Sequence, residues 1–350
     1  MSDINDMRVQ NDFKTISFSG YKKAAVRKEL VHNILNGKIE NSCYWCAELL
    51  CAGHFIEVWE SVIFTMSKHI HLANIKLPAY VEMRFKDFKT IVETGYADDQ
   101  LKMRNSKKIR LLFTELIAVL CLSNKKYTTE RIRIDKSDFD MTNMMTKLSA
   151  SNVDYGKAVF RLGDPKELFI SVNEFAFHIS RESKNIQQAC YWLEWIIQFE
   201  LICRGKKENC HITRRTFAPV QERFQMDIVW IIWECLLAEA TKRDALVGKT
   251  IGALLNIYSI RFTGGAKRKR ISTLYFAISL LTEPFNINQE LVSNKAKITT
   301  IKSKVDVIYK EIKKNEKAPR VAQLVGQNKP SSLERSIAKL EKMNEIYKIL

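Results

Sequence analysis

The residues best suited to chemistry are eight cysteines and six histidines, some of them at metal-ligand spacing. Zinc needs about four thiolate or imidazole ligands that converge at about 2.0–2.3 Å. The first cluster, Cys43, Cys46, Cys51 and His54, lies in a strongly helical stretch. On a helix its members would share one face but spread over about 16 Å. Because that spread is too wide for one ion, we interpret these residues as core positions.

A second cluster consists of Cys203, Cys210 and His211, in an expected loop with basic residues between them. It offers three ligands of the two types that zinc accepts most readily, thiolate and imidazole, and the fourth ligand would have to come from elsewhere. These three residues are therefore a weak candidate for a metal site.

The tripeptide Gly248-Lys249-Thr250 matches the end of a phosphate-binding loop. That motif needs a glycine at position 243, which is arginine here, and a preceding buried strand, whereas 229–240 reads as a helix. We find no complete catalytic motif elsewhere. The sequence therefore predicts a non-enzymatic protein without a cofactor.

Composition favours a helical fold that can position such residues. The chain has 350 residues, of which 46% are hydrophobic, with only 12 glycines and 6 prolines. So few turn-forming residues argue against β-sandwiches, β-barrels and glycine-rich cofactor folds. Helical periodicity recurs along most of the chain. We therefore expect an all-α protein.

The expected cellular compartment follows from the polar N-terminus, the apolar runs and the cysteine content. The first 20 residues are polar, and no apolar run reaches the roughly 18 residues of a membrane span. Eight cysteines in a chain of this kind are typical of reduced thiols. We expect a cytosolic or nuclear protein without membrane association.

We expect two related multi-helix domains followed by a basic helical extension. The stretch 151–165 carries two glycines and a proline, which is typical of a linker. The predicted organisation is a flexible N-terminus at 1–19, a helical domain at 20–150, a linker at 151–165, a second helical domain at 166–285 and the basic extension at 286–350.

A short echo indicates that the two domains are related. Residues 39–50 (IENSCYWCAELL) are similar to residues 186–197 (IQQACYWLEWII). Each copy follows an expected helix with a histidine, His32 or His178. We interpret the echo as a duplicated helical hairpin; the alternative is a chance likeness between two amphipathic helices.

Four of the six tryptophans occur in pairs at i, i+3 spacing, Trp192 with Trp195 and Trp230 with Trp233. Both rings of a pair then lie on one helix face. Aromatic side chains of this size anchor cores or interfaces. Core packing is favoured, and the functional alternative is an interface for a partner or a nucleobase.

Positive charge is the remaining signal, with a formal net charge of +17. It is concentrated in three places: the run 267–270 after a glycine pair, the segment 204–215 after the expected helix that contains Trp192 and Trp195, and the C-terminal region. From residue 294 on the sequence contains 14 Lys and Arg and 6 Asp and Glu. A solvated helix face would explain any single patch; together they favour phosphate contact, through counterion release, or an acidic protein face. The cations that we predict to contact nucleic acid are Lys206, Lys207, Arg214, Arg215, Lys267, Arg268, Lys269, Arg270, Lys313 and Lys314.

The strings at 43–49 (CYWCAEL), 190–197 (CYWLEWII) and 225–233 (QMDIVWIIW) carry a resemblance. Over about residues 20–285 the chain resembles an uncharacterised protein family of nucleocytoplasmic large DNA viruses, of the mimivirus and phycodnavirus type. The resemblance implies a viral origin and a place in the host cytoplasm (the viral factory), the nucleus or the virion, and it supplies no site residues. The first hairpin also resembles the helical collar of clamp-loader-type ATPases, although the chain lacks the ATPase module.

The leading hypothesis is therefore a non-enzymatic viral protein that binds nucleic acid or another polyanion during genome replication or packaging. The alternative is a minor capsid or assembly protein whose basic surface meets an acidic viral protein. Self-association through helix faces is compatible with both.

Overall fold

The structure is a computed structural model that describes residues 2–96 and 100–317. Within these residues the fold is all-α, with fifteen α-helices and no β-strand, which confirms the predicted fold class. An isolated bridge joins Ile16 to Lys22. None of the described helices combines the length and the apolar character that a membrane crossing requires.

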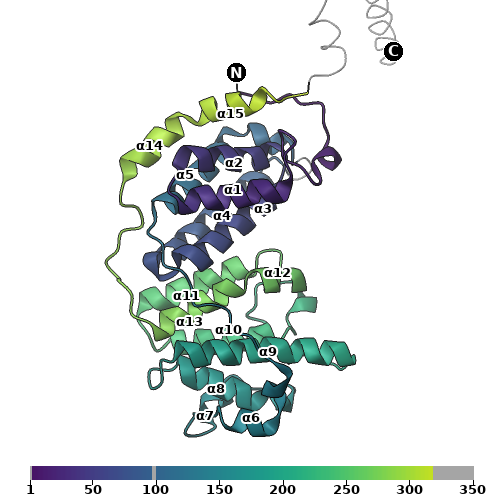
Figure 1. The fold of residues 1–350 in the computed structure, drawn as a ribbon, viewed down its shortest axis with the longest axis vertical. Helices are drawn as coiled ribbons and strands as arrows, with labels where there is room; N and C mark the ends of the chain where they lie inside the picture. The colour runs from purple at the N-terminus through teal and green to yellow at the C-terminus, as the bar shows by residue number, and fades with distance from the viewer. Residues whose placement is uncertain (1, 97–99, 318–350) are drawn as a thin grey trace, which may run out of the picture.

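Five helices form the N-terminal half of the molecule (Figure 1). The first two make a helical hairpin because only three residues separate them, and Gly37 takes a left-handed φ of +67° at the turn. A π-helical turn at Thr65–Ile70 continues the third helix toward the second half. The five are α1 (Lys23–Leu35), α2 (Ile39–Cys51), α3 (Phe55–Phe64), α4 (Leu77–Glu93) and α5 (Lys107–Leu122).

The second half contains a matching hairpin, α8 with α9, and a further set of helices stacked above it in Figure 1. Asn185 caps the long helix of that hairpin, its side chain accepting the Gln188 N–H. The helices of this half are α6 (Met141–Met145), α7 (Asp154–Lys157), α8 (Phe169–Ile179), α9 (Ile186–Lys206), α10 (Val229–Ala240), α11 (Ala245–Tyr258), α12 (Gly264–Lys269) and α13 (Ile271–Thr282).

The two halves repeat some of their helix pairings. The hairpin α1–α2 corresponds to α8–α9, and these are the two segments that carry the sequence echo. In the N-terminal half α5 packs on α2 and α4; in the second half α13 packs on α9 and α11. The corresponding helices α4 and α11 also pack against each other. A duplication would produce this arrangement, and duplication stays a prediction.

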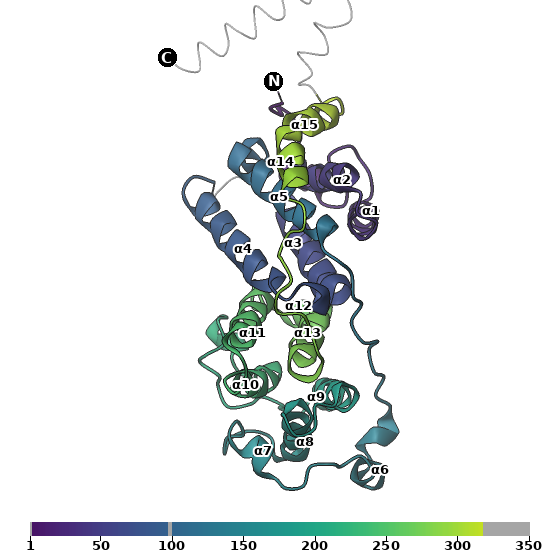
Figure 2. The same ribbon diagram turned by 90° about the vertical axis from the view of Figure 1, so that its left-hand side faces the viewer.

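The boundary between the halves lies earlier than the predicted linker. The extended segment after α5 already reaches the second half at Arg131, whose guanidinium pairs with Glu194 on α9 at 2.7 Å (Figure 2). The stretch 151–165 packs within the second half. Its Gly156 N–H donates to Asn173 Oδ1 at 2.9 Å, and an added Cβ would lie 3.1 Å from Asn173 Cα. This glycine permits close packing, so the predicted linker at 151–165 is wrong.

The predicted flexible N-terminus is also wrong for the described residues 2–19. Ile4, Phe13 and Phe18 are at most 1% exposed and belong to a small apolar cluster. The cluster is completed from the other end of the chain by Tyr309 and Ile312. Apolar side chains that lose their water in this way hold a segment in place.

The basic extension returns to the N-terminal half. Its described helices are α14 (Lys295–Ser303), which packs on α5, and α15 (Val305–Lys313), which packs on α2. Figure 1 shows both along the upper edge of the molecule. The rest of the predicted extension, 318–350, lies outside the described residues.

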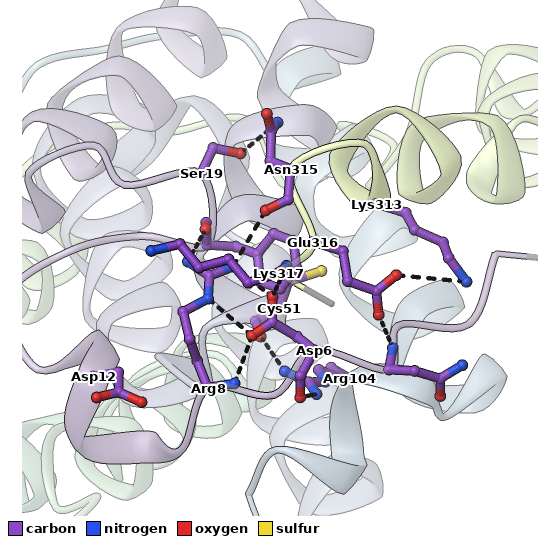
Figure 3. A network of polar contacts seen from close by, with 12 residues as sticks. Asp6, Arg8, Asp12, Ser19, Cys51, Arg104, Lys313, Asn315, Glu316 and Lys317 are labelled. Atoms are coloured by element: carbon purple, nitrogen blue, oxygen red, sulfur yellow. Dashed lines mark hydrogen bonds and ion pairs between the residues drawn. The ribbon is translucent and has the colours of Figure 1, made fainter. Parts of the chain in front are cut away.

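A polar network joins the two ends of the described chain (Figure 3). The Met7 N–H donates to the Lys317 carbonyl at 3.1 Å, and the Lys317 N–H donates to Asp6 Oδ2 at 2.8 Å. Arg8 pairs with Asp6 at 2.6 Å. Burial by itself raises the pKa of Asp6, but the hydrogen bonds from Arg8 and Lys317 outweigh it and lower the pKa. The extension is therefore an integral part of the N-terminal half up to Lys317.

Candidate nucleic-acid interface

The basic run 267–270 divides between the interior and the surface. Its first three residues form the second half of α12, and Arg270 follows the helix as its C-cap; the first turn is capped by the Thr263 hydroxyl, which accepts the Ala266 N–H at 3.1 Å. Lys267 and Arg270 are each 3% exposed, whereas the two residues between them are exposed. The division follows from helical geometry, since positions i and i+3 share a face.

Lys267 holds α12 in place. Its ammonium group donates to both carboxylate oxygens of Asp227, at 2.8 and 2.9 Å, and also to Glu200 near the end of α9. One buried cation thus connects α12, α9 and the segment 207–228 that follows α9. Lys267 was predicted to contact nucleic acid; its position in this ion cluster removes it from any phosphate-binding surface.

Arg270 is likewise structural. Its guanidinium pairs with Glu60 on α3 and donates to the Tyr258 carbonyl at 2.8 Å. The ion pair connects the second half to the N-terminal half. The predicted phosphate contact at Arg270 is therefore replaced by an internal one.

Arg215 is the third cation that the fold buries. It is fully buried and pairs with Asp164 at 2.6 Å and with Glu234 at 2.6 Å, and it donates to the Val159 carbonyl at 3.0 Å. These partners satisfy the fork of donors that arginine presents. This residue therefore stabilises the second half and is not available for nucleic acid.

The remaining predicted cations of the second half are exposed, and the structure adds others to them. Over the described segments 204–228 and 261–270, eight cations are exposed but only two acids, Glu208 and Glu222. Figure 1 shows the end of α9 and α12 on the same side of the molecule. We call this set of cations the basic edge; it consists of Arg204, Lys206, Lys207, Arg214, Arg223, Arg261, Arg268 and Lys269.

An open groove lies within the basic edge, between the segment 218–225 and the turn that follows α11. It encloses about 640 Å³, and Arg223 and Arg261 contribute its charge. No acidic residue is present among the described residues that line it. We call it the basic groove.

Sequence reasoning did not identify Arg223 and Arg261. Each has at least one uncharged neighbour in the sequence, and neither belongs to a run of basic residues that would draw attention to it. The only local signal is conformational: Arg261 adopts a φ of +44°, a left-handed value that is uncommon for residues other than glycine. That signal is not visible in the sequence.

Lys313 and Lys314 lie far from the basic edge, on α15 at the upper end of Figure 1. Lys313 pairs with Glu316 at 3.7 Å (Figure 3), and Lys314 pairs with Glu311 at 2.6 Å. The structure therefore brings together two of the three predicted basic patches and leaves the third apart.

The four paired tryptophans lie in the core. Trp192, Trp230 and Trp233 are fully buried, and Trp195 is 4% exposed. The structure assigns them to packing, which corrects the alternative of a stacking interface at these positions.

The weak metal candidates do not form a ligand set. Cys203 and Cys210 are buried, whereas the His211 side chain is exposed. Burial, followed by the neighbouring Cys203, raises the pKa of the Cys210 thiol, which disfavours the thiolate that zinc requires. The described residues contain no group of three or more His, Cys, Asp or Glu side chains placed to hold a metal ion.

No protein-family model, curated protein or solved structure matches the chain.

Proposed function

We propose that this protein binds nucleic acid through phosphate contacts at the basic edge, without catalysing a reaction. One observation carries the proposal: Lys267 joins α12 to α9 and so combines two separate basic segments into one surface with eight exposed cations and two exposed acids. A polyanion that spans this surface releases counterions at each contact.

The composition of the basic edge suits an anion that is bound in a fixed geometry. Five of its eight cations are arginines. The planar guanidinium binds two phosphate oxygens at once, which the lysine ammonium does not do. Arginine is accordingly the preferred residue where phosphate is recognised in a fixed geometry.

A salt titration tests the proposal. The purified full-length chain is mixed with fluorescently labelled DNA or RNA, and anisotropy is recorded between about 50 and 200 mM salt. We expect the logarithm of the affinity to fall linearly with the logarithm of the salt concentration, by about 0.9 per phosphate contact on duplex DNA. Absence of binding at the lowest salt would refute the proposal.

A poly-glutamate peptide serves as the competing polyanion in the same assay. If the basic edge serves an acidic protein partner, as an assembly protein would require, the peptide should displace nucleic acid at similar charge concentration. We expect it to compete poorly because duplex DNA carries one charge per about 1.7 Å of helix axis and releases condensed counterions on binding, which adds to its affinity.

The viral origin and a role in genome replication or packaging are proposals that rest on the sequence resemblance. Their direct test is whether the protein is found in purified virions. Its presence there would support packaging or a minor capsid role, and its absence would support replication.

A further inference from the structure

A second groove lies next to the basic edge, where α3 and α4 of the N-terminal half meet the turn after α11. It encloses about 200 Å³ and is lined mainly by aromatic and aliphatic side chains. We call it the aromatic groove; its principal lining residues are Phe55, Ile56, Trp59, Phe85, Phe88 and Val92.

The rings of the aromatic groove form one packed group. Trp59 meets Phe85 edge-on with ring centroids 5.1 Å apart, and Phe55 stacks on Phe88 at 5.7 Å. Trp59 is 3% exposed and forms the floor, while Phe85 and Phe88 are half-buried and Ile56 is 38% exposed. The groove is thus open to solvent and presents ring surfaces on which a further ring can stack.

Charge at the aromatic groove comes from the same residue that lines the basic groove. Arg261 contributes to both, so the two grooves adjoin at its side chain. On the other side, Glu60 is neutralised by its ion pair with Arg270. A ligand that lies in both grooves would therefore pass from an apolar surface to one with two arginines, Arg261 and Arg223.

We propose that the ligand is single-stranded nucleic acid, with one base stacked in the aromatic groove and the adjoining phosphates bound by Arg261 and Arg223. This inference rests on the proposed function and specifies its substrate class. Base stacking on aromatic side chains beside a cationic groove is the general mode by which proteins bind single strands. In a duplex the bases are already paired and stacked, so they do not enter such a groove.

The size of the aromatic groove agrees with this occupant. Pockets for drug-sized molecules usually enclose about 300–1,000 Å³, and this groove is smaller, at about 200 Å³. It therefore suits one planar ring and requires the rest of the ligand to lie outside it, along the basic groove.

The test compares three labelled DNA probes of equal length with the full chain: a single strand of thymidines, the same strand with abasic sites in place of bases, and a duplex. We expect the single strand to bind about tenfold more tightly than the abasic strand, which retains only the phosphate contacts. The duplex should bind more weakly than the single strand at the same salt concentration.

Variants locate the base. Phe85→Ala and the uncharged Ile56→Gln should each lower single-strand affinity about tenfold while leaving abasic-strand affinity within about twofold. Met83→Ala is the matched control, because Met83 is an exposed residue of the same helix that does not line the groove. Ile56→Gln protects the test against a folding defect in Phe85→Ala, since Ile56 is partly exposed and the substitution adds no charge.

The outcomes separate this inference from the proposed function. Equal binding of the normal and abasic strands, or unchanged single-strand binding by both variants, would overturn the stacking inference and leave phosphate binding intact. Binding of an aromatic acidic peptide in place of the oligonucleotide would also overturn it. Absence of binding to every probe would refute the proposed function itself.

Discussion

The basic edge and the C-terminal helices α14 and α15 are both rich in cations, but the fold uses their charge differently. Over residues 295–314 four of the seven lysines pair with acids: Lys302 with Glu115 at 2.6 Å, Lys304 with Glu40 at 2.5 Å, Lys313 with Glu316 at 3.7 Å and Lys314 with Glu311 at 2.6 Å. In the basic edge Arg204 pairs with Glu200 at 2.8 Å and Arg214 pairs with Glu222 at 2.7 Å, while the other six cations form no ion pair among the described residues. Positive charge in a sequence therefore identifies a binding surface only when the fold leaves it without acidic neighbours.

The apolar residues explain why the two regions differ. Buried apolar residues recur at helical spacing in α14 and α15, each of them at most 4% exposed: Ile301, Val305, Tyr309 and Ile312. They hold α14 and α15 flat against α2 and α5, which brings the lysines next to acids of those helices. The helix α12 is too short for such a stripe, and Lys267 anchors it instead.

The largest effect should be a loss of stability when Arg215, one of the three buried cations beside the basic edge, is removed. Arg215→Ala leaves the fully buried Asp164 carboxylate without its guanidinium, so we expect a loss of about 3–5 kcal/mol in the free energy of unfolding. Arg214→Ala is the control, because its partner Glu222 is largely exposed and the change should cost less than about 1 kcal/mol. Denaturant titration measures both; equal losses would contradict the division between inward and outward cations.

Charge reversal tests whether nucleic-acid affinity depends on the basic edge or on the lysines of α14 and α15. Changing Arg223, Arg261, Arg268 and Lys269 to glutamate should lower nucleic-acid affinity at least about a hundredfold, because four phosphate contacts become repulsive. The matched variant reverses Lys295, Lys297, Lys310 and Lys314 on α14 and α15, with the same change in net charge.

The matched variant should lose less than about threefold in affinity, because charges more than about 10 Å apart are screened at 0.1 M salt. Anisotropy titrations under one salt condition compare the two. Similar losses would show that overall charge, and not the basic edge, determines binding.

The smallest effect should be a change in the free energy of unfolding at acidic pH, caused by the ion pair that holds α14 on α5. Burial tends to raise the pKa of Glu115, but the ion pair with Lys302 and the hydrogen bond from Tyr80 hold it below its ordinary value of 4.5. The stability from this pair is therefore present above pH 4.5 and is lost as the pH falls through the lowered pKa.

In Lys302→Met this acid-dependent loss should shrink, while nucleic-acid binding at neutral pH stays unchanged. Unfolding free energies of both proteins across the acid range measure the difference. An identical pH dependence would show that the Lys302–Glu115 pair contributes nothing to holding α14.

Much of the secondary structure was predictable because helix signals are local. The similar segments 39–50 and 186–197, interpreted from the sequence as parts of helical hairpins, both lie in helices, α2 and α9. The boundary between the halves was not predictable in the same way. Gly156 resembles a linker glycine, but its lack of a side chain serves close contact with Asn173.

The sequence by itself determined that the protein is helical and basic, since helical periodicity, scarce turn residues and net charge are properties of residues and their neighbours. Only the tertiary structure decided which cations face solvent. Arg215, Lys267 and Arg270 pair with Asp164, Asp227 and Glu60, acids that lie 40 or more positions away in the chain. Because a buried ion pair forms only where the fold brings its two members together, no local pattern distinguishes these cations from exposed Arg268 and Lys269.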